Sequence, residues 1–171
     1  MSLLRRPPLP AGVRAALGLA RGERVLSTGR LRDGWAVATT RGLAVVDTDG
    51  GTVEVTLRRG WTDVAAGRLD ADTQALTVEW VDAATATVLE LSDARSLAFA
   101  TAFRQCVDSS VVHRERVTLP GGTDVQVALR RDGTGNLFVQ VMGPGTVDLK
   151  NPATAALVDA AEARVREAAG L

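Results

Sequence analysis

Residues 74–81 read Gln-Ala-Leu-Thr-Val-Glu-Trp-Val, and their side chains alternate between apolar and polar types. Leu76, Val78 and Trp80 therefore fall on one side of an extended chain, while a threonine and a glutamate fall on the other. A period of two predicts a β-strand that turns one face toward a core. Because the same period recurs on both sides of this stretch, we expect a protein that consists mostly of β-sheet.

Six further strands are predicted around this one, each short and bounded by turn residues. Asp33 and Gly34, for example, form a dipeptide that suits a tight hairpin between the first two strands. The predicted ranges are 24–31, 35–40, 42–47, 52–58, 61–69 and 86–91.

A helix is predicted after the seventh strand, with Ser92 as its cap. One face of this helix is formed by residues at helical spacing, namely Phe99, Phe103, Cys106 and Ser110. We expect this face to close the sheet, with Cys106 as a small buried core residue.

Further elements are predicted on both flanks of these strands and their helix. A short helix over 11–20 precedes the first strand. Asn151 and Pro152 suit the cap and first position of a last helix, which ends near Ala169. Three more strands lie before that last helix, at 113–119, 125–131 and 137–142.

Seven strands followed by one helix is the element order of the pleckstrin homology (PH) superfold. The amino-acid sequence also resembles those of uncharacterised actinobacterial proteins with a PH-like core. The similar segments are 22–26 (Gly-Glu-Arg-Val-Leu), 61–65 (Trp-Thr-Asp-Val-Ala), 74–78 and the helix that holds Phe99 and Phe103. The resemblance implies a fold and no functional residues, because PH-like domains bind lipids or peptides or serve in assembly.

The expected fold class is α+β and mostly β. The resemblance implies a seven-stranded, partly open barrel closed by a helix, within residues 1–112 that also include the short N-terminal helix. Residues 113–171 are expected to form a β-β-β-α extension packed on that domain.

Composition excludes several classes of protein. Twenty basic and twenty acidic residues cancel, so the charge expected of a dedicated nucleic-acid binder is missing. Cys106 is the sole cysteine and His113 the sole histidine, so we expect no disulfide, metal site or cofactor. Neither a signal peptide in 1–10 nor an integral membrane segment is predicted, and the cytoplasm is the expected location. Peripheral membrane contact stays open.

No catalytic site is predicted. Ser109, Ser110 and His113 are the residue types of a hydrolase, but no glycine-flanked nucleophile accompanies them. An unrecognised hydrolase therefore stays an alternative, and a non-enzyme is the leading hypothesis.

Basic residues of the first hairpin are candidates for ligand binding. Arg30 and Arg32 have the spacing with which PH domains hold an anionic ligand or lipid headgroup. The adjacent pairs at 58–59 and 130–131 are interpreted as solvated strand residues, because neighbours in a strand point to opposite faces. Since only one of the twenty basic residues is a lysine, the arginines are also what a GC-rich genome would encode.

The leading functional hypothesis is a PH-like scaffold that associates with a protein partner or with itself as a homodimer. One helix can cover only one face of the C-terminal sheet, so its other face needs a partner. Phe138 and Met142 lie on that second face and are the predicted association surface. Binding of a small anionic ligand through Arg30 and Arg32 is the alternative.

Overall fold

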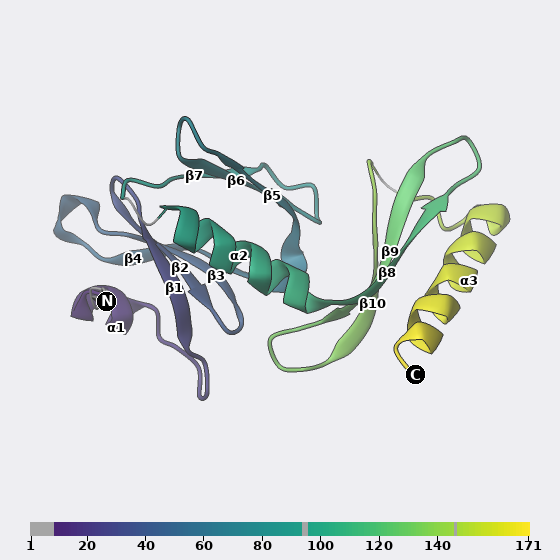
Figure 1. Ribbon diagram of the computed structural model, residues 1–171, viewed down its shortest axis with the longest axis horizontal. Helices are drawn as coiled ribbons and strands as arrows, with labels where there is room; N and C mark the ends of the chain where they lie inside the picture. Colours follow the sequence, from purple (N-terminus) through teal and green to yellow (C-terminus); the bar gives the residue numbers. More distant parts are fainter. Residues whose placement is uncertain (1–8, 94–95, 146) are drawn as a thin grey trace, which may run out of the picture.

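The computed structural model describes residues 9–93, 96–145 and 147–171, which form an α+β, mostly β structure (Figure 1). Its α-helices are α1 (Ala11–Ala16), α2 (Ser96–Ser110) and α3 (Pro152–Ala168). Single 3₁₀ turns occur at η1 (Asp49–Gly51) and η2 (Trp61–Asp63). The strands are β1 (Val25–Arg30), β2 (Gly34–Thr39), β3 (Gly42–Asp47), β4 (Glu54–Gly60), β5 (Val64–Asp70), β6 (Ala75–Trp80), β7 (Thr87–Glu90), β8 (Val111–Thr118), β9 (Asp124–Arg131) and β10 (Leu137–Met142).

The first seven strands form two antiparallel sheets. Their orders are β1-β2-β3-β4 and β5-β6-β7, so the consecutive strands β4 and β5 belong to different sheets. A bridge between Leu31 and Leu91 connects the sheets at the other end. The described strands therefore do not form a closed barrel.

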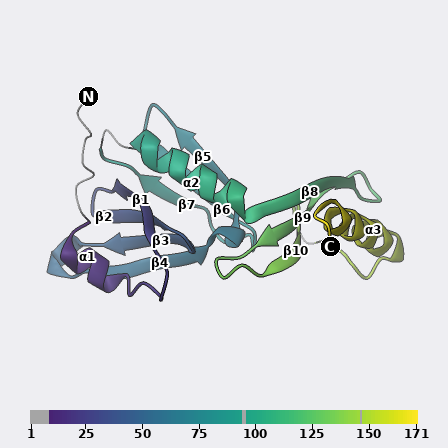
Figure 2. The same cartoon turned by 60° about the horizontal axis from the view of Figure 1, so that its bottom comes forward.

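Helix α2 lies across both sheets, and its position depends on two glycines (Figure 2). A Cβ atom at Gly67 of β5 would lie 2.4 Å from Cε1 of Phe103, and one at Gly29 of β1 would lie 3.0 Å from Cγ of Phe99. Both phenylalanines are buried in one core cluster with Trp61 and residues of β2, β3, β6 and β7. The phenylalanine face predicted for this helix is thus confirmed.

Two helix ends differ from the sequence-based expectation. Helix α1 ends at Ala16 rather than near residue 20, because Gly18 has a φ of 48°, which stops a helix. Helix α2 begins at Ser96, and Ser92 instead donates its hydroxyl to the carbonyl of Arg30. Part of the expected first turn, residues 94–95, lies outside the described residues.

The strand predicted over 61–69 is interrupted. Its first three residues form η2, where the carboxylate of Asp63 accepts a hydrogen bond from the backbone N–H of Gly60 at 2.9 Å. This turn directs Trp61 inward, where its Nε1 donates to the carbonyl of Thr39 at 2.9 Å. The turn positions the backbone carbonyls that contact the C-terminal part of the chain.

Strands β8 to β10 form a third antiparallel sheet, ordered β10-β9-β8, with α3 packed on one face. Asn151 caps α3 as predicted, since its side chain accepts from the backbone N–H groups of Ala153 and Thr154. Val127 and Leu129 of β9 are buried against Val158 of α3. The sheet and α3 lie at the opposite end of the molecule from α1 (Figure 1).

Candidate functional site

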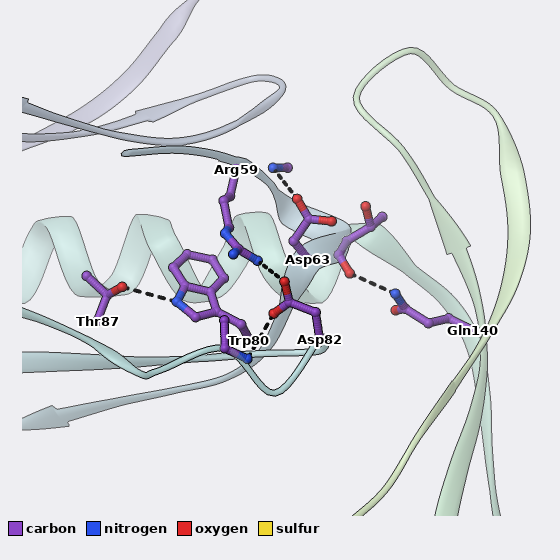
Figure 3. A network of polar contacts seen from close by, with 9 residues as sticks. Arg59, Asp63, Trp80, Asp82, Thr87 and Gln140 are labelled. Atoms are coloured by element: carbon purple, nitrogen blue, oxygen red, sulfur yellow. Dashed lines mark hydrogen bonds and ion pairs between the residues drawn. The ribbon is translucent and has the colours of Figure 1, made fainter. Parts of the chain in front are cut away.

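The C-terminal sheet is joined to the rest of the protein by a buried arginine. Arg130 is 1% exposed, and its Nη2 donates to the carbonyl of Trp61 at 2.7 Å and to Oγ of Ser110 at 2.9 Å. Nearby, Gln140 of β10 donates to the carbonyl of Thr62 at 3.1 Å, and Figure 3 shows it reaching toward the turn that holds Asp63. These bonds fix the angle at which the third sheet meets the first two.

The charge of Arg130 is not neutralised by an ion pair among the described residues. Burial lowers the pKa of its guanidinium, and the negative charge of Asp63 acts in the opposite direction. Three acceptors lie at Nη2: the carbonyls of Trp61 and Val64 and the hydroxyl of Ser110. Among the described residues, Nη1 reaches only the sulfur of Met142, at 3.6 Å, and Nε has no partner. The donors of this buried cation are therefore incompletely used.

The arginine lies beside a groove between the third sheet and the remainder of the protein, which we call the inter-unit groove. It consists of two adjoining cavities that share Ala65, Ala66, Gln126 and Met142. The α2-side cavity measures about 460 Å³ and is walled by α2, including Leu97 and Phe103. The β6-side cavity measures about 730 Å³ and extends toward Trp80.

One wall of the groove is the free edge of a sheet. Among the strands that the structure describes, β5 pairs with β6 only, and its register shifts between Val64 and Ala66. The residues that follow Val64 are exposed and small, Ala65, Ala66 and Gly67. Backbone groups on such an edge can pair with another extended chain, and small side chains permit its approach.

The opposite wall is the face of the C-terminal sheet that α3 leaves uncovered. Arg114 of β8 pairs with Ala128 of β9, and Arg116 pairs with Gln126. Both arginines lie on the same face as Arg130, because they occupy alternate or directly opposite positions in the sheet. Neither forms an ion pair with a carboxylate in the described parts of the chain.

The far end of the groove is held by a polar network around Trp80. The guanidinium of Arg59 lies 4.7 Å from the ring centroid of Trp80 and 2.8 Å from a carboxylate oxygen of Asp82 (Figure 3). The indole Nε1 donates to Oγ1 of Thr87 at 3.1 Å. The hydrogen bond from Arg59 lowers the pKa of Asp82.

The first hairpin does not bring its two candidate residues into a common clamp. Arg30 lies 5.1 Å from the ring centroid of Trp35, while Arg32 lies 3.9 Å from a carboxylate oxygen of Glu90. Arg32 and Glu90 are both largely exposed, and such a pair contributes little energy. Anion binding at this hairpin stays a prediction.

One of the two predicted association residues, Met142, lies at the inter-unit groove, and Phe138 lies on the same sheet face outside the walls of the two cavities. Met142 lines both cavities, and Phe138 stands opposite Arg130 in the pairing of β9 with β10. Both side chains are half-buried. The face that the sequence marked as apolar thus also carries three arginines.

The three residues considered for a hydrolase site, Ser109, Ser110 and His113, lie in different surroundings. Ser110 donates to the carbonyl of Val107 at 2.6 Å and accepts from Arg130, whereas Ser109 and His113 are exposed. The described residues contain no hydrogen bond between His113 and either serine. Cys106 is half-buried rather than fully buried, and burial raises the pKa of its thiol.

The interpretation of Arg130 as a solvated residue was wrong. It shares a face with Gln126 and Ala128 in a strand whose other positions are apolar, and the sequence showed that this face needed cover. Only the structure shows that the turn at Trp61 packs against this face. Arg131, the next residue, is exposed as predicted.

The described residues contain no cluster of three or more histidine, cysteine or carboxylate side chains that could hold a metal ion. Within the same residues, none of the helices combines the length and apolar character needed to cross a bilayer. No family model matches the chain, and no curated protein or solved structure matches it.

Proposed function

We propose that this chain is a cytoplasmic, non-catalytic, PH-like interaction module that binds an extended segment of a partner protein in the inter-unit groove. The observation that carries the proposal is the free edge of β5 beside the apolar wall of α2. An added strand would gain main-chain hydrogen bonds from β5, and its alternate side chains would enter the two cavities.

The element order supports a PH-like core. Four antiparallel strands are followed by three, and one helix then packs across both sheets. The three-stranded C-terminal sheet with α3 is the extension of this core, joined to it through Arg130. The extension supplies the second wall of the groove, which the core by itself would lack.

The chemistry of the groove favours binding over catalysis. Its walls offer strand backbone, apolar side chains, arginines and the carboxylates Glu79, Asp108 and Asp124. Among the described residues, no serine or cysteine beside a histidine lines them. Nucleophilic catalysis by a serine or cysteine needs a general base such as histidine within hydrogen-bond reach. A protein segment, in contrast, needs only the backbone edge and shaped pockets.

A random-peptide display library selected on the purified full-length chain tests this function. Selected peptides are measured against the wild type and Ala65→Trp, where the indole would fill the groove at an exposed position. We expect Ala65→Trp to weaken binding by at least about tenfold. Val88→Trp is the matched control, because Val88 is exposed on β7 and lines neither cavity.

Two results would contradict the proposal. Failure of the library to yield any peptide that binds the folded chain is one. Equal affinity of the selected peptides for the wild type and for Ala65→Trp is the other, since it would place the binding site elsewhere.

A further inference from the structure

Building on the proposed function, we infer that the bound segment is acidic and that a carboxylate side chain of it enters the α2-side cavity and pairs with Arg114. Binding of protein segments in general does not require this property. It follows from the charges that face the groove.

The cationic residues of the groove are concentrated at one end. The α2-side cavity is lined by Arg104, Arg114 and Arg130, with Asp108 as its acidic residue. Asp108 lies 3.6 Å from Arg104 and is paired with it. Arg114 therefore faces this cavity without an ion-pair partner among the described residues, and the charge of Arg130 is opposed by Asp63, which forms no ion pair with it.

Arg114 is the residue that a ligand would touch. It is exposed, whereas Arg130 is 1% exposed and stands behind it in the sheet. The buried guanidinium is tied to carbonyl and hydroxyl oxygens, which do not cancel its charge, and Asp63 opposes that charge without forming an ion pair with it. Its Nε has no acceptor among the described residues. Because a protein interior screens charge less than water does, Arg130 makes the cavity attractive to an anion even without direct contact.

A comparison within the same sheet shows that unpaired arginines are not its general property. On the opposite face, Arg164 of α3 donates to both carboxylate oxygens of Glu115, with Nε at 3.0 Å from Oε1 and 2.9 Å from Oε2. Glu115 lies between Arg114 and Arg116 in β8. On the face of β8 toward α3, the charge of Glu115 is therefore neutralised by Arg164. On the other face, Arg114 and Arg116 present their positive charges to the groove.

The rest of the groove favours a protein segment over a nucleic acid. Leu97, at 69% exposed, and Phe103 line the same cavity as Arg114 and offer an apolar surface to neighbouring side chains. The β6-side cavity is lined by two carboxylates, Glu79 and Asp124, against one arginine, Arg116, so its charge disfavours a continuous phosphate backbone. An acidic side chain flanked by apolar ones fits both the charge and the apolar wall.

The peptides selected on the wild type provide the probe. We expect them to share an acidic residue beside apolar residues, and we expect its replacement by the corresponding amide to weaken binding by at least about tenfold. Arg114→Gln should produce a similar loss, which is larger at low ionic strength than at high. Arg166→Gln is the matched control, because Arg166 lies in α3 and lines neither cavity.

Charge reversal gives a second readout. Arg114→Glu should reject the selected peptides and bind versions in which lysine replaces the acidic residue. This rescue would not occur if Arg114 served only to maintain the fold. Circular dichroism of each variant establishes that it is folded before binding is compared.

The outcomes separate the inference from the function on which it rests. Peptides that are blocked by Ala65→Trp but bind Arg114→Gln with wild-type affinity would overturn the acidic assignment and leave the binding groove intact. Loss of binding on C-terminal amidation would overturn the assignment to a side chain. Tighter binding of a single-stranded oligonucleotide than of any peptide, abolished by Arg114→Gln, would also overturn it. Absence of any selected peptide would instead contradict the proposed function.

Discussion

Arg130 donates a 2.7 Å hydrogen bond to the carbonyl of Trp61, which lies 69 residues earlier in the chain. The bond joins the middle strand of the third sheet to the turn between the first two sheets. A second bond, to Ser110, joins the same side chain to the end of α2. Three separate parts of the chain therefore depend on a single guanidinium.

The first prediction concerns this arginine. Arg130→Met should lower the free energy of unfolding by about 3 kcal/mol, because the carbonyl of Trp61 and the hydroxyl of Ser110 lose their buried donor. Urea denaturation measures the change. Arg131→Met is the control, since the exposed neighbour should change stability by no more than about 0.5 kcal/mol. Equal effects of the two substitutions would show that Arg130 does not hold the junction.

Gly67 should tolerate no side chain. A Cβ atom there would lie 2.4 Å from Phe103, so Gly67→Ala must displace α2 or β5 and should destabilise the fold by about 1 to 3 kcal/mol. Thermal unfolding measures the loss. At Gly12 in α1 a Cβ atom would meet, of the described residues, only Val53 at 3.7 Å, and Gly12→Ala should leave stability equal or slightly higher. A stable Gly67→Ala variant would show that α2 is not packed this closely.

Cys106 should react slowly with thiol reagents in the folded protein. Burial raises the pKa of its thiol, so the reactive thiolate is scarcer at neutral pH than in an exposed cysteine. The labelling rate should keep rising with pH above the range in which an ordinary thiol levels off. The urea-unfolded chain supplies the reference rate, and stoichiometric labelling of the native protein within minutes would contradict the prediction.

Asp132 should contribute to stability in a pH-dependent way. Its carboxylate accepts hydrogen bonds from the backbone and side chains of Thr134 and Asn136, and these lower its pKa from 3.8 to about 2. A lowered folded-state pKa stabilises the folded protein above about pH 4, and the contribution is lost as the pH falls toward 2. The wild type should thus exceed Asp132→Asn in urea midpoint at pH 7, and the gap should narrow between pH 4 and 2. A gap that is constant with pH would exclude this role.

Self-association through the predicted surface gives a last prediction. Phe138 is half-buried on the sheet face that α3 does not cover, and a symmetric dimer is the commonest assembly of identical chains. We expect Phe138→Glu to sediment as a folded monomer under conditions in which the wild type is dimeric. A wild type that stays monomeric at every accessible concentration would exclude the homodimer.

Local elements were predicted well from the sequence. The strands β3 and β10 have the predicted bounds, 42–47 and 137–142, and Asn151 caps α3. Such features depend on neighbours in the chain, because side-chain alternation, capping and turn residues act over a few positions. Helix α1 ends earlier than predicted because the positive φ angle of Gly18 stops it.

The candidate site was predicted less completely than the helices and strands. Phe138 and Met142 lie on the predicted face of the third sheet, which α3 leaves uncovered, and their role in association stays a prediction. Their neighbour Arg130, however, was assigned to solvent. Its environment is created by the carbonyl of Trp61, and the inward turn of Trp61 depends on the carboxylate of Asp63. No pattern within a short window of sequence records a contact between residues this far apart.

The sequence by itself determined the strands, the helices and the apolar face of each, because these follow from the order of neighbouring side chains. Only the tertiary structure decided which faces meet. It placed Arg114 and Arg130 across a groove from the free edge of β5, far from them in sequence. The physical reason is that burial, unpaired charge and a shared cavity are properties of the assembled faces, and they do not exist until distant strands pack together.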